Sequence, residues 1–362
     1  MLAGLASVGF RGKMVAMRFV TTHGSPFERG AQTGEAFAEA IGRSVAFNRR
    51  YLTRHGLAHD GLETILLPYL EASRRALPHL VEQIEGMAEG AGAPFLDLFF
   101  ANAFEEVYGI LELGLPQPAP LERCTDVAVG APGGTLLGHT EQWYAGDDGE
   151  VGVVLDVPQD GPALLAPVVA GTLPLVGINA FGGSFGAMSL SASDERVGVP
   201  RSLVARDVLD ARDRADAVAR ATRDDRAGGY SYLCAFPDGD VVAIESTATT
   251  AAVLEVREHT NHALDPSVAA AALPPSEGSR SRLARAHQLG PAAAPTVEGL
   301  ASVLADHDGA ADAICAHPDP RDGEEASTIL FAIICEPGTR TMWVTPGHAC
   351  TGTFERFAIP ER

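Results

Sequence analysis

The spacing of apolar residues changes about a third of the way along the chain. In the first part, apolar residues recur every three or four positions, the period of an α-helix that buries one face. Ser25-Pro26 combines a preferred N-cap residue with a proline at the first helical position, and so predicts a helix start. We therefore predict helical segments at residues 25–54, 62–90 and 95–110.

A proline-rich stretch, Pro116-Gln117-Pro118-Ala119-Pro120, follows and predicts a stiff, extended linker. Directly after it, residues 124–130 and 135–138 predict two strands joined by the turn Ala131-Pro132-Gly133-Gly134, a hairpin that begins at Cys124. Turn sequences at 237–240 and 336–339 predict further hairpins, so antiparallel sheet should dominate. The other predicted strands are 152–157, 163–169, 175–180, 230–236, 241–245, 252–256, 328–335 and 341–344, and the other predicted helices are 200–222, 279–289 and 297–307.

Composition narrows the class of protein. With 46% apolar and 20% charged residues, the 362-residue chain can bury a large core and should fold. Its 27 basic and 47 acidic residues leave a net charge of -20, which excludes nucleic acid as an expected partner. The span 161–193 carries no charged residue, but its prolines and glycines would break a membrane helix, so we expect short buried strands and no membrane partner.

The five cysteines are odd in number and include no C-x-x-C pair, so we expect neither a disulfide framework nor a zinc knuckle. With no secretory signal at the amino terminus, this pattern favours a cytoplasmic protein. Cys124 differs from the other four, because a single cut after the linker would make it the first residue of a new chain. Its freed α-amino group, with a pKa of about 7.7–8.0, could then take the proton of the thiol, whose pKa is about 8.5. The alternative is a buried cysteine that acts as a small apolar residue.

Two other motifs carry chemistry. His259-Thr260-Asn261-His262 could hold a metal, could donate an amide hydrogen bond to an oxyanion, or could be a structural turn. Two histidines alone do not complete a metal site, so we expect no metal there. Gly182-Gly183-Ser184-Phe185-Gly186 matches the G-x-S-x-G elbow of serine hydrolases, but no long helical face follows it, and tight packing of glycines is the simpler interpretation.

The segments 123–129 and 138–143 resemble the region around the nucleophile in the acyl-coenzyme A:6-aminopenicillanate (isopenicillin N) acyltransferase-like family of N-terminal-nucleophile (Ntn) hydrolases. The resemblance continues through residues 177–179, 198–200, 244–246, 259–262, 314–317 and 342–347. It implies an α+β fold, an αββα four-layer sandwich, and self-cleavage between Arg123 and Cys124. Residues 1–123 would then be a helical segment, a candidate small chain or pro-segment, packed as one unit with the catalytic portion 124–362.

Carried over by position, the resemblance makes Cys124 the nucleophile and Asn261 the oxyanion donor. Two positions depart from the family pattern: Arg123 replaces a glycine, and Gln142 replaces an aspartate that would hold the charge of the α-amino group. In a regular strand Glu141 would point to the opposite face. Asp126, two residues after the nucleophile and on its face, is a candidate substitute.

We therefore expect an amide hydrolase or acyltransferase that acts on a small N-acyl compound through a cysteine thioester. Its partner would be a small-molecule amide or thioester; hydrolysis needs no cofactor, and a coenzyme A thioester would serve as acyl donor in transfer. The acidic surplus favours a cationic or neutral amine. If the chain is not cut, His139 is the candidate side-chain base. The alternatives are a binding protein that keeps the fold without activity, and a serine hydrolase that uses Ser184.

Overall fold

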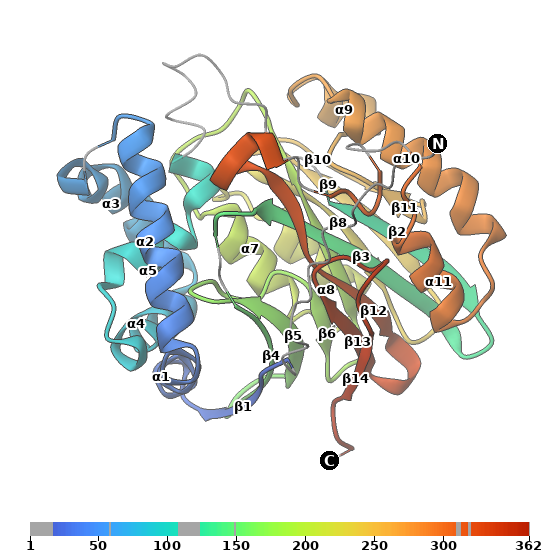
Figure 1. The fold of residues 1–362 in the computed structure, drawn as a ribbon, viewed down its shortest axis with the longest axis horizontal. Coiled ribbons are helices and arrows are strands. Elements are labelled where there is room, and N and C mark those ends of the chain that lie inside the picture. Colours follow the sequence, from blue (N-terminus) through green and yellow to red (C-terminus); the bar gives the residue numbers. More distant parts are fainter. Residues whose placement is uncertain are drawn as a thin grey trace, which may run out of the picture.

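The structure, a computed structural model, has two β-sheets packed face to face between layers of helices (Figure 1). It describes residues 17–57, 59–107, 124–147, 150–308, 313–317 and 320–361. The eight-stranded sheet has the strand order β1-β4-β5-β6-β7-β8-β9-β10, and the six-stranded sheet has the order β11-β2-β3-β12-β13-β14. Neighbouring strands are antiparallel except for β1 and β4, which pair in parallel.

The strands of the eight-stranded sheet are β1 (Phe19–Gly24), β4 (Val151–Pro158), β5 (Leu164–Val169), β6 (Gly177–Asn179), β7 (Ser184–Leu190), β8 (Gly229–Ala235), β9 (Val241–Ser246) and β10 (Ala251–Leu254). The strands of the six-stranded sheet are β2 (Thr125–Ala131), β3 (Gly134–Tyr144), β11 (Glu258–His259), β12 (Ser327–Glu336), β13 (Thr341–Pro346) and β14 (Glu355–Ala358). The helices are α1 (Pro26–Ala36), α2 (Ala38–Arg54), α3 (His59–Ala76), α4 (Pro78–Ala91), α5 (Phe95–Ala101), α7 (Arg201–Val208), α8 (Arg214–Ala221), α9 (Pro266–Ala269), α10 (Glu277–Leu289) and α11 (Val297–Leu304).

Apolar packing defines four layers. Residues of both sheets share one buried cluster, in which Leu137 and Ile333 of the six-stranded sheet lie with Leu233 of the eight-stranded sheet. Helices α1 to α5 form a second cluster with Val154 and Val168 of the eight-stranded sheet. Helices α10 and α11 pack on the other face of the six-stranded sheet. In Figure 1 the blue helices and the orange helices accordingly lie on opposite sides of the sheets. The predicted αββα sandwich is confirmed.

The hairpin that starts after Cys124 and the predominance of antiparallel pairing are confirmed as well. The helical prediction at 25–54 is wrong at Phe37, where α1 ends and α2 begins, and that at 62–90 breaks at Leu77, because the residue before a proline is disfavoured in the α conformation. Strand β1 precedes these helices, in a segment for which the sequence predicts helices alone. The linker 116–120 and residues 108–110 lie outside the described residues.

The uncharged stretch 161–193 forms β5, β6 and β7 and the turns between them, as its prolines and glycines predict. Among the described helices, none is both long enough and apolar enough to cross a membrane.

Helices α1 and α4 pack with almost no side chain between their backbones. Gly30 and Gly34 of α1 face α4, and a Cβ added at Gly34 would lie 2.2 Å from the carbonyl oxygen of Met87. The contact is reciprocal, since a Cβ at Gly86 of α4 would lie 2.1 Å from the carbonyl oxygen of Phe27. Such distances admit only hydrogen on the glycine Cα. This close pair anchors the helical layer beside β1, the strand that precedes α1.

We predict that Gly34→Ala lowers the free energy of unfolding by about 1–3 kcal/mol or more, because the added methyl group forces the two helix backbones apart. The matched control is Gly42→Ala in α2, where a Cβ would meet nothing within 4 Å. That change should raise stability by about 0.5–1 kcal/mol through helix propensity. Urea denaturation of both variants checks this, and an equal effect of the two changes would contradict the packing argument.

Candidate active site

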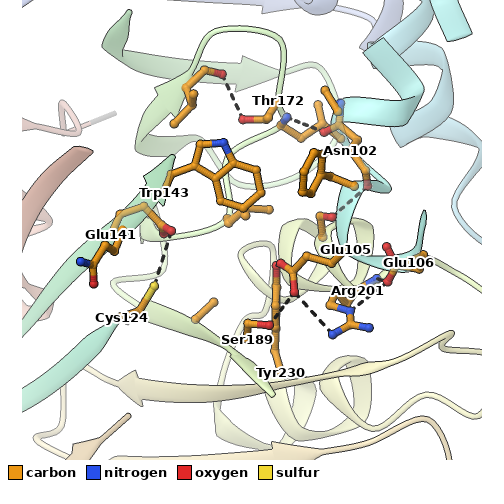
Figure 2. Close-up of a pocket in the computed structure, with 18 of the residues that line it drawn as sticks. Asn102, Glu105, Glu106, Cys124, Glu141, Trp143, Thr172, Ser189, Arg201 and Tyr230 are labelled. Atoms are coloured by element: carbon orange, nitrogen blue, oxygen red, sulfur yellow. Dashed lines mark hydrogen bonds and ion pairs between the residues drawn. The ribbon is translucent and has the colours of Figure 1, made fainter. Parts of the chain in front are cut away.

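A cavity of about 540 Å³ lies where the helical layer meets the two sheets, and Cys124 is part of its wall. Figure 2 shows Cys124 and Glu141 on one side of this pocket and Glu105, Arg201 and Tyr230 on the other. The apolar part of the wall includes Phe104, Trp143, Leu173, Leu330 and Phe331. The pocket thus combines a large apolar surface with two separate polar sides.

Cys124 is buried, with 5% of its surface exposed, and lies immediately before β2. Its Sγ is 3.5 Å from Oε1 of Glu141, a residue of the neighbouring strand β3 (Figure 2). Thiol sulfur, imidazole nitrogen and carboxylate oxygen of Cys124, His139 and Glu141 all lie within 4.8 Å of one another. The structure therefore places a thiol and a carboxylate at the pocket wall, with a fully buried imidazole beside them.

His139 connects this group to Asp126 in the interior. Its Nδ1 lies 2.6 Å from Oδ1 of Asp126, and its Nε2 lies 3.2 Å from Oε2 of Glu141. Both Asp126 and His139 are fully buried and are directly opposite each other in the β2–β3 register. Gly186 of β7 makes room for them, since a Cβ there would lie 2.1 Å from Oδ2 of Asp126. Contact with two carboxylates holds the imidazole in one orientation.

These contacts determine the protonation states of His139 and Cys124. Burial by itself lowers the pKa of His139, but Asp126 and Glu141 outweigh it and raise that pKa to about 9, so the imidazole is cationic at neutral pH. Burial, followed by the nearby Glu141 carboxylate, raises the pKa of the Cys124 thiol well above its usual value. In the intact chain His139 is therefore a poor base, and the thiol keeps its proton. A metal ion on Cys124, His139 and Glu141 would have to displace the proton of His139, which this environment opposes.

The opposite side of the pocket is acidic. Arg201, at the start of α7, forms ion pairs with Glu106 at 3.0 Å, Glu195 at 2.6 Å and Glu105 at 3.4 Å. Glu105 also accepts hydrogen bonds from the hydroxyl groups of Tyr230 and of Ser189, the latter at 2.5 Å. Three carboxylates around one guanidinium leave a surplus of negative charge beside the cavity.

Asn261 is buried, and its side-chain amide is connected to the backbone of Cys124 through Arg282. Its Nδ2 donates to the carbonyl oxygen of Ser189 at 3.1 Å, and its Oδ1 accepts from Nη2 of Arg282 at 3.3 Å. Arg282 also donates to the carbonyl oxygen of Cys124 and, at 3.1 Å, to Oγ1 of Thr125. Asn261 is thus linked to the pocket through Ser189 and to the Cys124 backbone through one guanidinium.

The two histidines beside Asn261 make hydrogen bonds inside the protein. His259 contacts Oε1 of Glu245 at 2.7 Å through Nε2 and the carbonyl oxygen of Thr260 at 2.6 Å through Nδ1. Nδ1 of His262 lies 2.7 Å from the hydroxyl oxygen of Ser279. Both rings therefore brace the turn that carries Asn261.

The expectation for Glu141 and Gln142 is wrong. It is Glu141 that shares the face of Cys124, and Gln142, the next residue in β3, points the other way. The Gln142 side chain is buried, and within the described chain its amide atoms have no hydrogen-bond partner. Asp126 does lie on the face of Cys124, but its carboxylate binds His139.

The serine-hydrolase alternative is also contradicted. Ser184 begins β7, so a strand and not a helix follows it, and its side chain is fully buried. The motif's last glycine, Gly186, has a packing role instead, because it accommodates the Asp126 carboxylate. Arg123, the other half of the expected cleavage site, lies outside the described residues.

The four-layer architecture, with a cysteine immediately before strand β2 of an inner sheet, defines the class, an Ntn-hydrolase fold. Residues 131–349 match the model of the acyl-coenzyme A:6-aminopenicillanic acid acyl-transferase family, and the chain belongs to this family. Among solved structures it is similar to penicillin V acylase from Agrobacterium tumefaciens, at 12% identity over 65% of this chain and 86% of that chain, with a TM-score of 0.45. It is also similar to a mutant of the conjugated bile acid hydrolase from Clostridium perfringens, at 9% identity over 66% and 97% of the two chains, with a TM-score of 0.39. The assignment rests on the family match.

Sequence reasoning missed several residues of the site. Glu141 could have been found from the turn, because a two-residue loop at 132–133 sets a register in which position 141 is opposite position 124. Glu105, Arg201 and Tyr230 come from separate elements, and no spacing in the sequence indicates that they meet.

The charge on His139 predicts a pH dependence of stability. Because the folded state raises the pKa of His139 from 6.5 to about 9, its contribution is fully present below pH 6.5 and is lost as the pH rises through about 9. Compared with His139→Gln, the wild type should lose up to about 3 kcal/mol of unfolding free energy over this range. Urea denaturation at pH 6, 8 and 10 measures the difference.

The control is His287→Gln, which removes a half-exposed imidazole. Its stability should follow the wild type at each pH. A constant difference between wild type and His139→Gln from pH 6 to pH 10 would show that His139 is not charged in the folded protein.

Proposed function

We propose that this protein is an amide hydrolase or acyltransferase in which Cys124, freed by self-cleavage after Arg123, is the nucleophile. The observation that carries the proposal is the position of the Cys124 sulfur on the wall of a 540 Å³ pocket, 3.5 Å from the Glu141 carboxylate. A buried thiol with only an apolar role would not need a carboxylate and a charged imidazole beside it.

Self-cleavage would proceed by attack of the Cys124 sulfur on the carbonyl carbon of Arg123. The C–N bond between the two residues breaks, the nitrogen takes a proton, and a thioester remains. Water then hydrolyses the thioester, which releases the Arg123 carboxylate and restores the thiol. Glu141 is the nearest group that can take the thiol proton at the first step.

The cut changes the chemistry of Cys124, because it creates an α-amino group on the same residue. This amine replaces the missing base: its ordinary pKa of about 7.7–8.0 lets it accept the thiol proton near neutral pH. The Glu141 carboxylate would stabilise the resulting ammonium group, the role for which Gln142 lacks a charge. His139 and Asp126 would keep Glu141 in place and remain unchanged in the reaction.

With substrate, the thiolate would attack the amide carbonyl and form a tetrahedral oxyanion. The side-chain amide of Asn261 would donate a hydrogen bond to this oxyanion. One hydrogen of that amide already donates to the carbonyl oxygen of Ser189, so the second hydrogen would serve the oxyanion. The leaving amine takes the proton from the α-ammonium group and departs, leaving an acyl thioester on Cys124. Water resolves the thioester in hydrolysis, and a second amine resolves it in transfer.

The two sides of the pocket suggest the substrate class. Trp143, Phe104 and Leu173 offer an apolar wall for an acyl chain or ring. The carboxylate surplus around Arg201 suits a neutral or cationic amine and disfavours an anionic one.

We predict that the purified protein separates under denaturation into two chains of about one third and two thirds of its 37.8 kDa mass, the larger beginning at Cys124. Cys124→Ala should remain a single chain, because it lacks the attacking sulfur. Cys234→Ala, which removes a buried thiol of the core, should still be cut. Mass spectrometry and N-terminal sequencing of fresh and aged samples check this.

Intact protein that neither turns over amides nor reacts with a thiol-directed acylating probe would support the non-catalytic binding alternative and overturn the proposal. Intact protein whose activity disappears in Cys124→Ala would retain the nucleophile and overturn the self-cleavage step alone.

We also predict that Asn261→Ala lowers kcat by about 10² to 10³ with little change in KM, because the lost amide acts on the oxyanion. Melting temperature and stoichiometric labelling of Cys124 serve as controls for folding. Unchanged turnover in a folded variant would remove Asn261 from the site.

A further inference from the structure

A second cluster of chemistry-bearing side chains lies outside the Cys124 pocket. His307 follows α11, Cys315 and His317 belong to the segment 313–317, and Cys350 lies between β13 and β14. Each of the four residues offers one nitrogen or sulfur atom, and these four atoms all lie within 4.8 Å of one another. None of these residues lines the cavity around Cys124.

The distances in this cluster are within a few tenths of an ångström of the spacing of metal ligands. Nε2 of His307 lies 3.0 Å from Nε2 of His317, which in turn lies 3.4 Å from Sγ of Cys350. In a tetrahedral zinc site, with Zn–N of about 2.0–2.1 Å and Zn–S of about 2.3 Å, neighbouring ligand atoms are roughly 3.3–3.8 Å apart. Two imidazole nitrogens that face each other can share only one proton when both rings are neutral, whereas a cation between them satisfies both lone pairs.

The backbone around the cluster holds the ligands in place. The N–H of Cys315 donates to the carbonyl oxygen of Asp306 at 2.9 Å, which fixes its segment to the end of α11. The ring of His348 stacks on that of His317, with centroids 3.9 Å apart, and limits its rotation.

We propose that His307, Cys315, His317 and Cys350 form a tetrahedral site for a Zn²⁺ ion. Two thiolates and two imidazoles are the donor set that zinc prefers, and four protein ligands leave no open position for substrate. The site is therefore structural: it connects the end of α11 and the segment 313–317 to the loop before β14. The exposed His307 and His317 provide the entry path for the ion.

The experiment uses the full chain, purified under reducing conditions, stripped with a chelator and reconstituted with Zn²⁺. We expect about one zinc ion per chain by inductively coupled plasma mass spectrometry, and loss of that ion in Cys315→Ser, His317→Ala and Cys350→Ser. Substitution with Co²⁺ should give the visible bands of a tetrahedral site and a thiolate charge-transfer band. Zinc should raise the melting temperature of the wild type but not that of the ligand variants.

Three controls make the result specific to this cluster. Cys124→Ala, which removes the thiol of the other potential metal-binding group, should keep the zinc, as should Cys234→Ala and His287→Ala. Zinc lost in Cys124→Ala but kept in Cys350→Ser would overturn the assignment. So would a reconstituted wild-type protein that binds no metal, or a Cys315–Cys350 disulfide in the freshly purified protein that reduction does not convert into a zinc-binding form.

Discussion

The contact between His139 and Asp126, 2.6 Å long and fully buried between the two sheets, is the interaction on which the candidate site depends. Two ionisable groups in the interior are costly unless each compensates the other, so the pair fixes the relative position of β2 and β3. Gly186 in the facing sheet leaves the volume that the carboxylate needs. The orientation of His139 then determines where Glu141 lies, and Glu141 is the group closest to the Cys124 sulfur.

A second buried histidine–carboxylate pair joins one sheet to the other. His259 of β11 is paired in register with Asp126, and its ring contacts Glu245 of β9 in the opposite sheet. Glu245 also accepts the N–H groups of Leu264 and Asp265, so one carboxylate organises the chain that follows Asn261. The nucleophile candidate is therefore held by a buried ion pair within the six-stranded sheet, and the oxyanion candidate by a buried histidine–carboxylate contact that joins the two sheets.

The sequence predicts the layers better than it predicts the site. Alternating apolar residues and turn dipeptides identify the hairpin at Cys124 and most strands, because each depends on neighbours in the chain. The predicted face of Glu141 is wrong, because it rests on the family pattern at position 142 and not on the register of the hairpin. The cluster of His307, Cys315, His317 and Cys350 could not be predicted at all, since its spacing matches no short motif and only the fold brings α11 next to the loop before β14.

The parallel pairing of β1 with β4 gives the residues before Cys124 a structural role at the edge of a sheet. Residues 19–24 cover the edge of the eight-stranded sheet, where β4 would otherwise present a row of unpaired backbone groups. An exposed edge of this kind is a template for aggregation with other chains. Because β1 precedes β4 in the chain, the ribosome synthesises the covering strand before the strand whose edge it covers. A break in the chain between β1 and β4 would leave the edge of β4 covered as long as the two strands stay paired.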